Sequence, residues 1–141
     1  MRRVVTAIVA LGVVATLASA PPPAVLAADA PAERVLVMYF HRTQRCPTCL
    51  KMGSYSEEAV KTGFADQLKA GKVEFHYIDF QDKKNEAITK GYKVSGPTLM
   101  VARVAGNKVA EYNNVTEIWT KVGDKKTFIA YVQAGVKGYQ K

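Results

Sequence analysis

The chain of 141 residues has two cysteines, Cys46 and Cys49, which are separated only by Pro47 and Thr48. This Cys-x-x-Cys spacing suits thiol–disulfide exchange, because one thiolate can attack a substrate sulfur and the second thiol can then displace the product. A disulfide that closes so small a loop adds little stability through loop entropy. The spacing therefore predicts that the pair serves chemistry, with Cys46 as nucleophile and Cys49 as resolving thiol.

Zinc sites also use Cys-x-x-Cys, but they need four ligands from cysteine, histidine or carboxylate side chains. The chain has two histidines, His41 and His76. A site built from Cys46, Cys49 and His41 is short of ligands, and His76 lies in an expected strand with aromatic neighbours. We expect no metal, and no flavin or nicotinamide cofactor, since the chain has no glycine-rich phosphate-binding fingerprint.

The elements on either side of the pair favour a reactive first cysteine. The continuous apolar run at residues 35–40 predicts a strand buried on both faces, followed by a polar loop at residues 41–45. Cys46 then opens a helix with Pro47 in its first turn. The amide groups and dipole of a helix N-terminus favour a thiolate there. Cys49, one turn later, is expected to be more buried.

Hydrophobic periodicity and turn residues predict the other elements. Gly53 is expected to interrupt or bend the first helix, with a restart at Ser54, a capping box from Glu57 and an end at Gly71. The expected later elements are strands at 73–80, 98–104 and 109–112, a helix at 82–90 capped by Asp82, a turn at Gly106-Asn107, a short helix near Ile118 capped by Asn114, and a last helix capped by Asp124 with Phe128, Val132 and Val136 on one face. Tyr112 and Trp119 are expected to be core residues.

This order of elements, with Gly96-Pro97-Thr98 before the third strand, resembles the thioredoxin superfamily over residues 34–137. The resemblance implies an α/β thioredoxin-like fold: a four-stranded mixed sheet in the order 2-1-3-4, flanked by helices, with the active site at the N-terminus of the first helix. It also implies that Pro97 is cis and faces the dithiol. Gly96, Pro97 and Thr98 would bind an extended substrate.

The chain departs from thioredoxins in two ways. Thioredoxins have Trp-Cys-Gly-Pro-Cys, whereas Arg45 precedes Cys46 here, and they carry a buried acid at the end of the first strand, where this chain has Met38-Tyr39-Phe40. His41 could replace that acid as proton acceptor. His41, Arg42 and Arg45 could also place positive charge near Cys46, which stabilises a thiolate and makes the disulfide more oxidising, unless these side chains point to solvent.

Tyr39-Phe40-His41, Arg45 to Cys49, and Phe80 resemble a narrower group more closely. These are small exported thioredoxin-like bacterial proteins known as a nitrophenyl compound nitroreductase subunit and sometimes placed with arsenic resistance. The resemblance implies a redox role, such as electron delivery, without fixing a substrate.

Residues 1–27 have the layout of a secretory signal peptide: a basic start at Arg2-Arg3, an apolar run at residues 4–18, and a cleavage site after Val25-Leu26-Ala27. Residues 28–33 read as a linker and residues 34–141 as the thioredoxin-like domain. We expect export to the periplasm or outside the cell, with no stable membrane span after cleavage. An uncleaved leader would instead form an N-terminal anchor.

The formal net charge is +8, and the lysines are scattered along the chain with no basic stripe interleaved with aromatics, so we expect no nucleic-acid partner.

The leading interpretation is a thiol–disulfide oxidoreductase. Its partners would be protein or small-molecule disulfides or thiols, and a redox partner that resets the dithiol. Two alternatives remain: a module that holds Cu(I) or an arsenical through the same pair, and an inert interaction protein with a static disulfide.

Overall fold

A computed structural model describes residues 31–140. In chain order, the elements are β1 (Glu33–His41), α1 (Pro47–Gly63), α2 (Ala65–Lys69), β2 (Val73–Asp79), the 3-10 turn η1 (Lys83–Asn85), α3 (Glu86–Gly91), β3 (Thr98–Ala105), β4 (Lys108–Asn114), α4 (Ile118–Lys121) and α5 (Lys125–Lys137).

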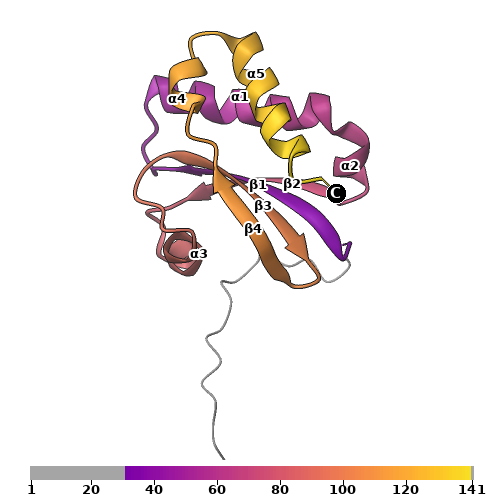
Figure 1. Cartoon of the computed structure of the whole chain (residues 1–141). Coiled ribbons are helices and arrows are strands. Elements are labelled where there is room, and N and C mark those ends of the chain that lie inside the picture. Colours follow the sequence, from indigo (N-terminus) through magenta and orange to yellow (C-terminus); the bar gives the residue numbers. More distant parts are fainter. Residues whose placement is uncertain (1–30, 141) are drawn as a thin grey trace, which may run out of the picture.

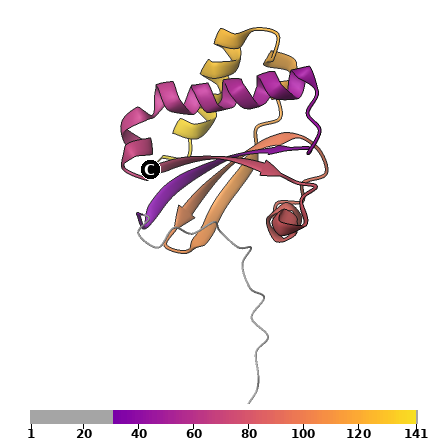
Figure 2. The ribbon, with the colours of Figure 1, turned by 180° about the vertical axis from the view of Figure 1, so that it is seen from behind.

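The four strands form one mixed sheet in the order β2-β1-β3-β4. β1 pairs with β2 in parallel and with β3 antiparallel, and β3 and β4 form an antiparallel hairpin. Helices α1 and α5 lie across one face of the sheet, and α3 lies against one end of the other (Figures 1 and 2). The predicted thioredoxin-like fold, including the strand order, is confirmed.

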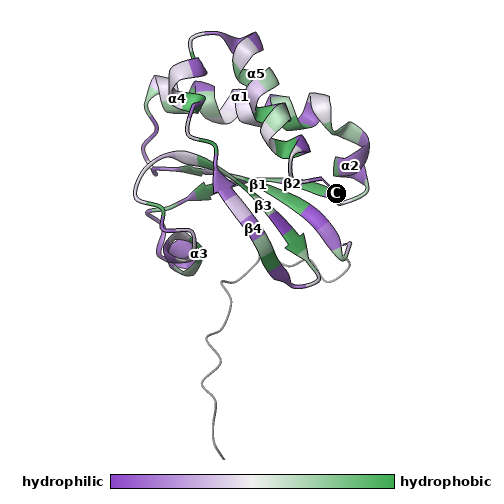
Figure 3. Ribbon diagram, in the orientation of Figure 1, coloured by the Kyte–Doolittle hydropathy of each residue, from purple (hydrophilic) through white to green (hydrophobic). Residues whose placement is uncertain are grey.

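Strand β1 is the centre of the core. Its alternate side chains point to opposite faces: Val35, Val37 and Tyr39 join the cluster beneath α1 and α5, while Leu36, Met38 and Phe40 join the cluster on the side of α3. Figure 3 shows the corresponding concentration of hydrophobic residues in the central strands. The continuous apolar run thus forms the doubly buried strand that the sequence predicts, and it ends where the loop to Cys46 begins.

The expected interruption of the first helix at Gly53 is wrong, because α1 runs unbroken from Pro47 to Gly63. Gly53 is instead a point of close approach. A Cβ atom there would lie 2.9 Å from ring carbons of both Tyr39 and Tyr77. The absence of a side chain at Gly53 therefore lets α1 pack closely against the two tyrosine rings, one turn after Cys49.

The end of the first helix also differs from the prediction. The chain leaves α1 at Phe64 (φ −138°), whose buried side chain joins the core, and continues in the short α2. Gly71 (φ +67°) follows α2 in the left-handed conformation that glycine favours.

Two helix caps are confirmed and one is wrong. Asp82 accepts a bond from the Lys84 amide, and Asp124 accepts one from the Thr127 amide. Asn114 caps no helix, because β4 extends to include it and its side chain accepts a hydrogen bond from Thr98.

The expectation that Tyr112 and Trp119 are core residues is also wrong. Their exposed fractions are 42% and 47%. Tyr112 lies on edge strand β4 and keeps one ring contact with Tyr92, at 4.9 Å between centroids. Trp119 lies on α4, where Ile118 takes the buried position.

The predicted signal peptide at residues 1–27 lies outside the described residues, as does the first half of the predicted linker at residues 28–33. The linker ends earlier than predicted, because β1 already begins at Glu33. Within residues 31–140, no helix has the length and apolar character needed to cross a membrane.

The close approach at Gly53 predicts that Gly53→Ala lowers the free energy of unfolding by about 1–2 kcal/mol, because crowding of the tyrosine rings outweighs the gain in helix propensity. Gly135→Ala is the matched control, because a Cβ there meets only Val115 at an ordinary 3.8 Å. This control should be neutral or gain up to about 1 kcal/mol. Denaturant unfolding measures both, and a stable Gly53→Ala protein would contradict the packing described.

Candidate functional site

The two cysteines form a disulfide at the start of α1. Cys46 is the N-cap residue, and its Sγ accepts a hydrogen bond from the Cys49 amide at 3.1 Å. Cys46 is exposed to solvent, whereas Cys49 is only 7% exposed. The accessible sulfur thus meets a helix amide that would stabilise a thiolate, while the roles of nucleophile and resolving thiol stay predictions.

Tyr39 connects the end of β1 to the redox pair. Its buried hydroxyl donates a hydrogen bond to the Cys49 carbonyl at 2.8 Å. Loss of hydration raises the pKa of Tyr39 to about 12, against a smaller opposing effect of the nearby Arg45 charge. The phenol is therefore a neutral donor. Sequence reasoning assigned Tyr39 no part in the redox site, although its position just before the loop to Cys46 was a usable signal.

The structure brings His41 and Arg45 together. Arg45 Nη2 donates to His41 Nε2 at 3.0 Å, and His41 Nδ1 donates to the Arg42 carbonyl at 2.9 Å. Since a guanidinium can only donate, Nε2 is the acceptor in this contact and Nδ1 is the ring donor. Both ring nitrogens of the buried His41 are therefore engaged, while the Arg42 side chain is exposed.

Tyr77, on β2, completes this side of the site and was missed by sequence reasoning. The Arg45 guanidinium carbon lies 5.1 Å from the centroid of its ring, a cation–π contact. The Tyr77 hydroxyl donates to Glu57 on α1 at 3.0 Å. Burial, followed by the bond to Glu57 and its charge, raises the pKa of Tyr77 to about 12.

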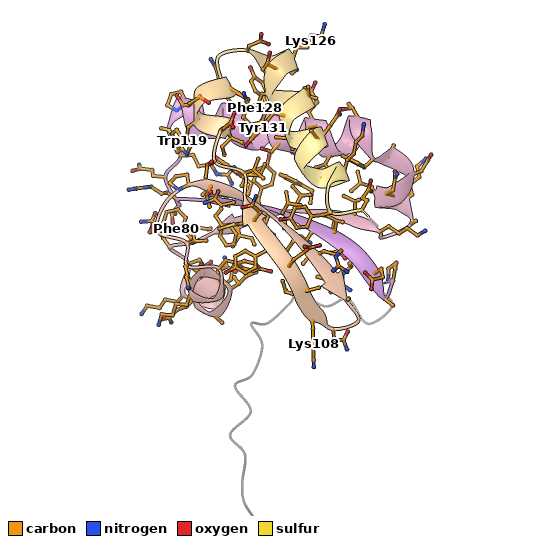
Figure 4. The ribbon with its side chains drawn as sticks, viewed as in Figure 1. Phe80, Lys108, Trp119, Lys126, Phe128 and Tyr131 are labelled. Atoms are coloured by element: carbon orange, nitrogen blue, oxygen red, sulfur yellow. A yellow bond between two sulfur atoms is a disulfide. The ribbon has the colours of Figure 1, made fainter. Side chains whose placement is uncertain are left out.

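The Gly96-Pro97-Thr98 segment reaches the same end of the sheet. Thr98 pairs with Phe40 at the end of β1, next to the loop that leads to Cys46. Figures 1 and 2 both show α4 beside the start of α1, and Figure 4 shows Trp119 on this side. A hollow of about 220 Å³ lies along the segment, lined by Lys93, Ser95, Gly96, Pro97, Asn114 and Trp119 among others.

The expectation of a cis Pro97 is wrong, since residues 31–140 contain no cis peptide bond. The trans isomer is the ordinary preference of an X–Pro bond, by about 0.5–1 kcal/mol. The Pro97 carbonyl lies 3.3 Å from Trp119 Nε1 and accepts its hydrogen bond. This contact connects the segment to α4.

No group of three or more His, Cys, Asp or Glu side chains suited to a metal gathers within the described part of the chain. His41 is turned toward Arg42 and Arg45 rather than free to join the cysteines. His76 contacts Glu74 at 2.9 Å on β2 and takes no part in the site.

No family model matches this chain, and no curated protein matches it. Solved structures that resemble it include a malarial protein, with 16% identity, a TM-score of 0.45, and coverage of 77% of this chain and 99% of the other. Fasciola hepatica thioredoxin has 17% identity and a TM-score of 0.46, covering 76% and 82%. The Drosophila thioredoxin Deadhead has 23% identity and a TM-score of 0.39, covering 57% and 67%.

The buried bond from Tyr39 predicts that Tyr39→Phe lowers the free energy of unfolding by about 1–2 kcal/mol, because the Cys49 carbonyl loses its side-chain partner. The pKa of this phenol is about 12 rather than 10.0, so its neutral form stabilises the fold below pH 10 and this contribution is lost as the pH rises through 12. The variant should therefore lose one late-ionising phenol in a tyrosinate absorbance titration. Native phenols that all ionise together near pH 10 would contradict this environment.

Proposed function

We propose that this protein is an exported thiol–disulfide oxidoreductase that acts through Cys46 and Cys49. The observation that carries the proposal is the disulfide at the N-cap of α1, with one sulfur accessible and the other buried. A pair that can close as a disulfide can release and take up two electrons. The difference in exposure between Cys46 and Cys49 supports different tasks for the two sulfurs, as stepwise exchange requires.

In the reducing direction, the Cys46 thiolate attacks one sulfur of a substrate disulfide. An S–S bond forms between Cys46 and the substrate, and the other substrate sulfur leaves as a thiolate that takes up a proton. Cys49, after losing its proton, attacks Cys46 Sγ and releases the second substrate thiol. The substrate gains two electrons and the protein ends as the Cys46–Cys49 disulfide. The same steps run in reverse when the protein oxidises a dithiol.

The backbone of Gly96, Pro97 and Thr98 would bind the segment of substrate that flanks its reacting sulfur. The hollow beside this segment and its position at the end of β1 support that role. Arg45, with His41, would tune the stability of the Cys46 thiolate. The folded-back position of Arg45 favours this over a side chain extended into solvent.

The predicted leader at residues 1–27 supports export to the periplasm or outside the cell, where disulfides persist. A second protein would have to return the dithiol to its starting state after each turnover. Delivery of electrons to a partner enzyme is the form of this activity that the narrower sequence resemblance suggests.

The proposal predicts that Cys49→Ser accumulates mixed disulfides through Cys46, because the resolving thiol is gone. The variant is expressed with its leader in a bacterial host, and trapped complexes are identified on non-reducing gels and by mass spectrometry. Cys46→Ser, the matched control, should trap few or none because its remaining thiol is buried.

Two outcomes would contradict the proposal. If neither variant traps a partner and the wild type does not exchange with glutathione, the disulfide is static. If no partner is trapped but the reduced protein binds Cu(I) or an arsenical tightly, the pair serves a binding module instead.

A further inference from the structure

Arg45 directly precedes the accessible cysteine, yet its side chain is folded back against the sheet. Two groups hold it there: His41 Nε2, which accepts its hydrogen bond at 3.0 Å, and the Tyr77 ring, whose centroid lies 5.1 Å from its guanidinium carbon. The side chain is partly buried, in contrast to the exposed Arg42 in the same loop. The position of this charge is therefore set by residues of β1 and β2.

Tyr77 is itself held firmly. Its hydroxyl donates to Glu57 at 3.0 Å. Its ring meets the rings of Tyr39, His41 and Phe75 at centroid distances of 6.1, 6.1 and 5.1 Å. Its edge faces Gly53, where any Cβ would collide with it. These contacts orient the ring on which the guanidinium lies, although Tyr77 itself is 38% exposed.

The charge of Arg45 acts on the surroundings of the redox pair. It opposes the rise in the pKa of Tyr39, whose hydroxyl lies 2.8 Å from the Cys49 carbonyl. The negative charge nearest to the Tyr77 hydroxyl belongs to Glu57, which is paired with Lys61 at 2.6 Å. The positive charge of Lys61 partly neutralises Glu57, so Glu57 cancels less of the positive charge of Arg45.

From this geometry we infer that Tyr77 is a positioning residue that holds Arg45 beside the redox pair and thereby makes the Cys46–Cys49 disulfide more oxidising. The inference rests on the proposed function. A fixed positive charge stabilises the thiolate and so the reduced form. A more stable reduced form raises the reduction potential. The face of the ring carries this role, and the hydroxyl only orients the ring.

The test is the equilibrium of the purified protein with glutathione, in which the disulfide and two glutathione molecules give the dithiol and one glutathione disulfide. Tyr77→Leu removes the ring and should lower the constant for this reaction about fivefold, which corresponds to a potential ~20 mV more negative. Tyr77→Phe keeps the ring and should stay within about twofold of wild type. Arg45→Gln should reproduce the fivefold loss, and adding Tyr77→Leu to it should cause no further change, because the two residues act as one unit.

Tyr55→Leu is the matched control. It removes another ring that carries a cation, Lys125, at 5.5 Å, and should leave the constant unchanged. Equal constants for wild type and Tyr77→Leu would overturn the inference, as would a Tyr77→Leu loss that persists in full on the Arg45→Gln background. Those results leave the proposed function intact, since exchange itself is still observed. Failure of the wild type to equilibrate with glutathione would instead contradict the proposed function.

Discussion

The hydrogen bond from the Tyr39 hydroxyl to the Cys49 carbonyl joins the central strand to the helix that begins at the redox pair. It forms only if β1 is buried on both faces and α1 lies close above it. The first condition is met by the apolar run that precedes His41, and the second by the absence of a side chain at Gly53. With the first turn of α1 fixed in this way, Cys46 lies at the helix N-terminus with its sulfur accessible, and Cys49 is turned inward.

The same packing determines which groups can handle protons near the buried thiol. Tyr39 is neutral with a pKa of about 12, so it donates a hydrogen bond but is a poor base at neutral pH. His41 Nε2 already accepts a hydrogen bond from Arg45, and its role as proton acceptor stays a prediction. Under the proposed function, the proton of Cys49 would leave through the first substrate thiolate or water, and the positive charge of Arg45 would favour the Cys46 thiolate.

Much of the fold could be predicted from local sequence. The apolar run of β1, the turn at Gly106 and the cap at Asp124 each express a preference that needs no distant partner. The wrong predictions concern residues whose role depends on tertiary contacts. Gly53 is predicted as a helix breaker because local sequence does not show its close contact with two tyrosine rings. Those rings come from β1 and β2, which are distant from Gly53 in the chain. Trp119 is predicted as a core residue because the sequence does not show which of two adjacent apolar residues faces the core. In the structure Ile118 is buried and Trp119 is exposed.

In the candidate site, too, local sequence predicts some residues, whereas the roles of others depend on contacts between distant parts of the chain. The predicted roles of Cys46 and Cys49 rest on their spacing and on the helix that starts after the loop from β1. Tyr77 could not be assigned from sequence, because its contact with Arg45 joins positions far apart in the chain. The isomer of Pro97 was inferred from resemblance alone, and the described chain follows the ordinary trans preference.

The central claim is that the fold makes two chemically similar thiols unequal. The direct measurement is the rate at which each cysteine of the reduced wild-type protein is alkylated by iodoacetamide at neutral pH, followed by peptide mass mapping. The account predicts that Cys46 is modified first and faster than the cysteine of glutathione, while Cys49 is protected until the protein unfolds. Equal and slow modification of both cysteines would contradict it.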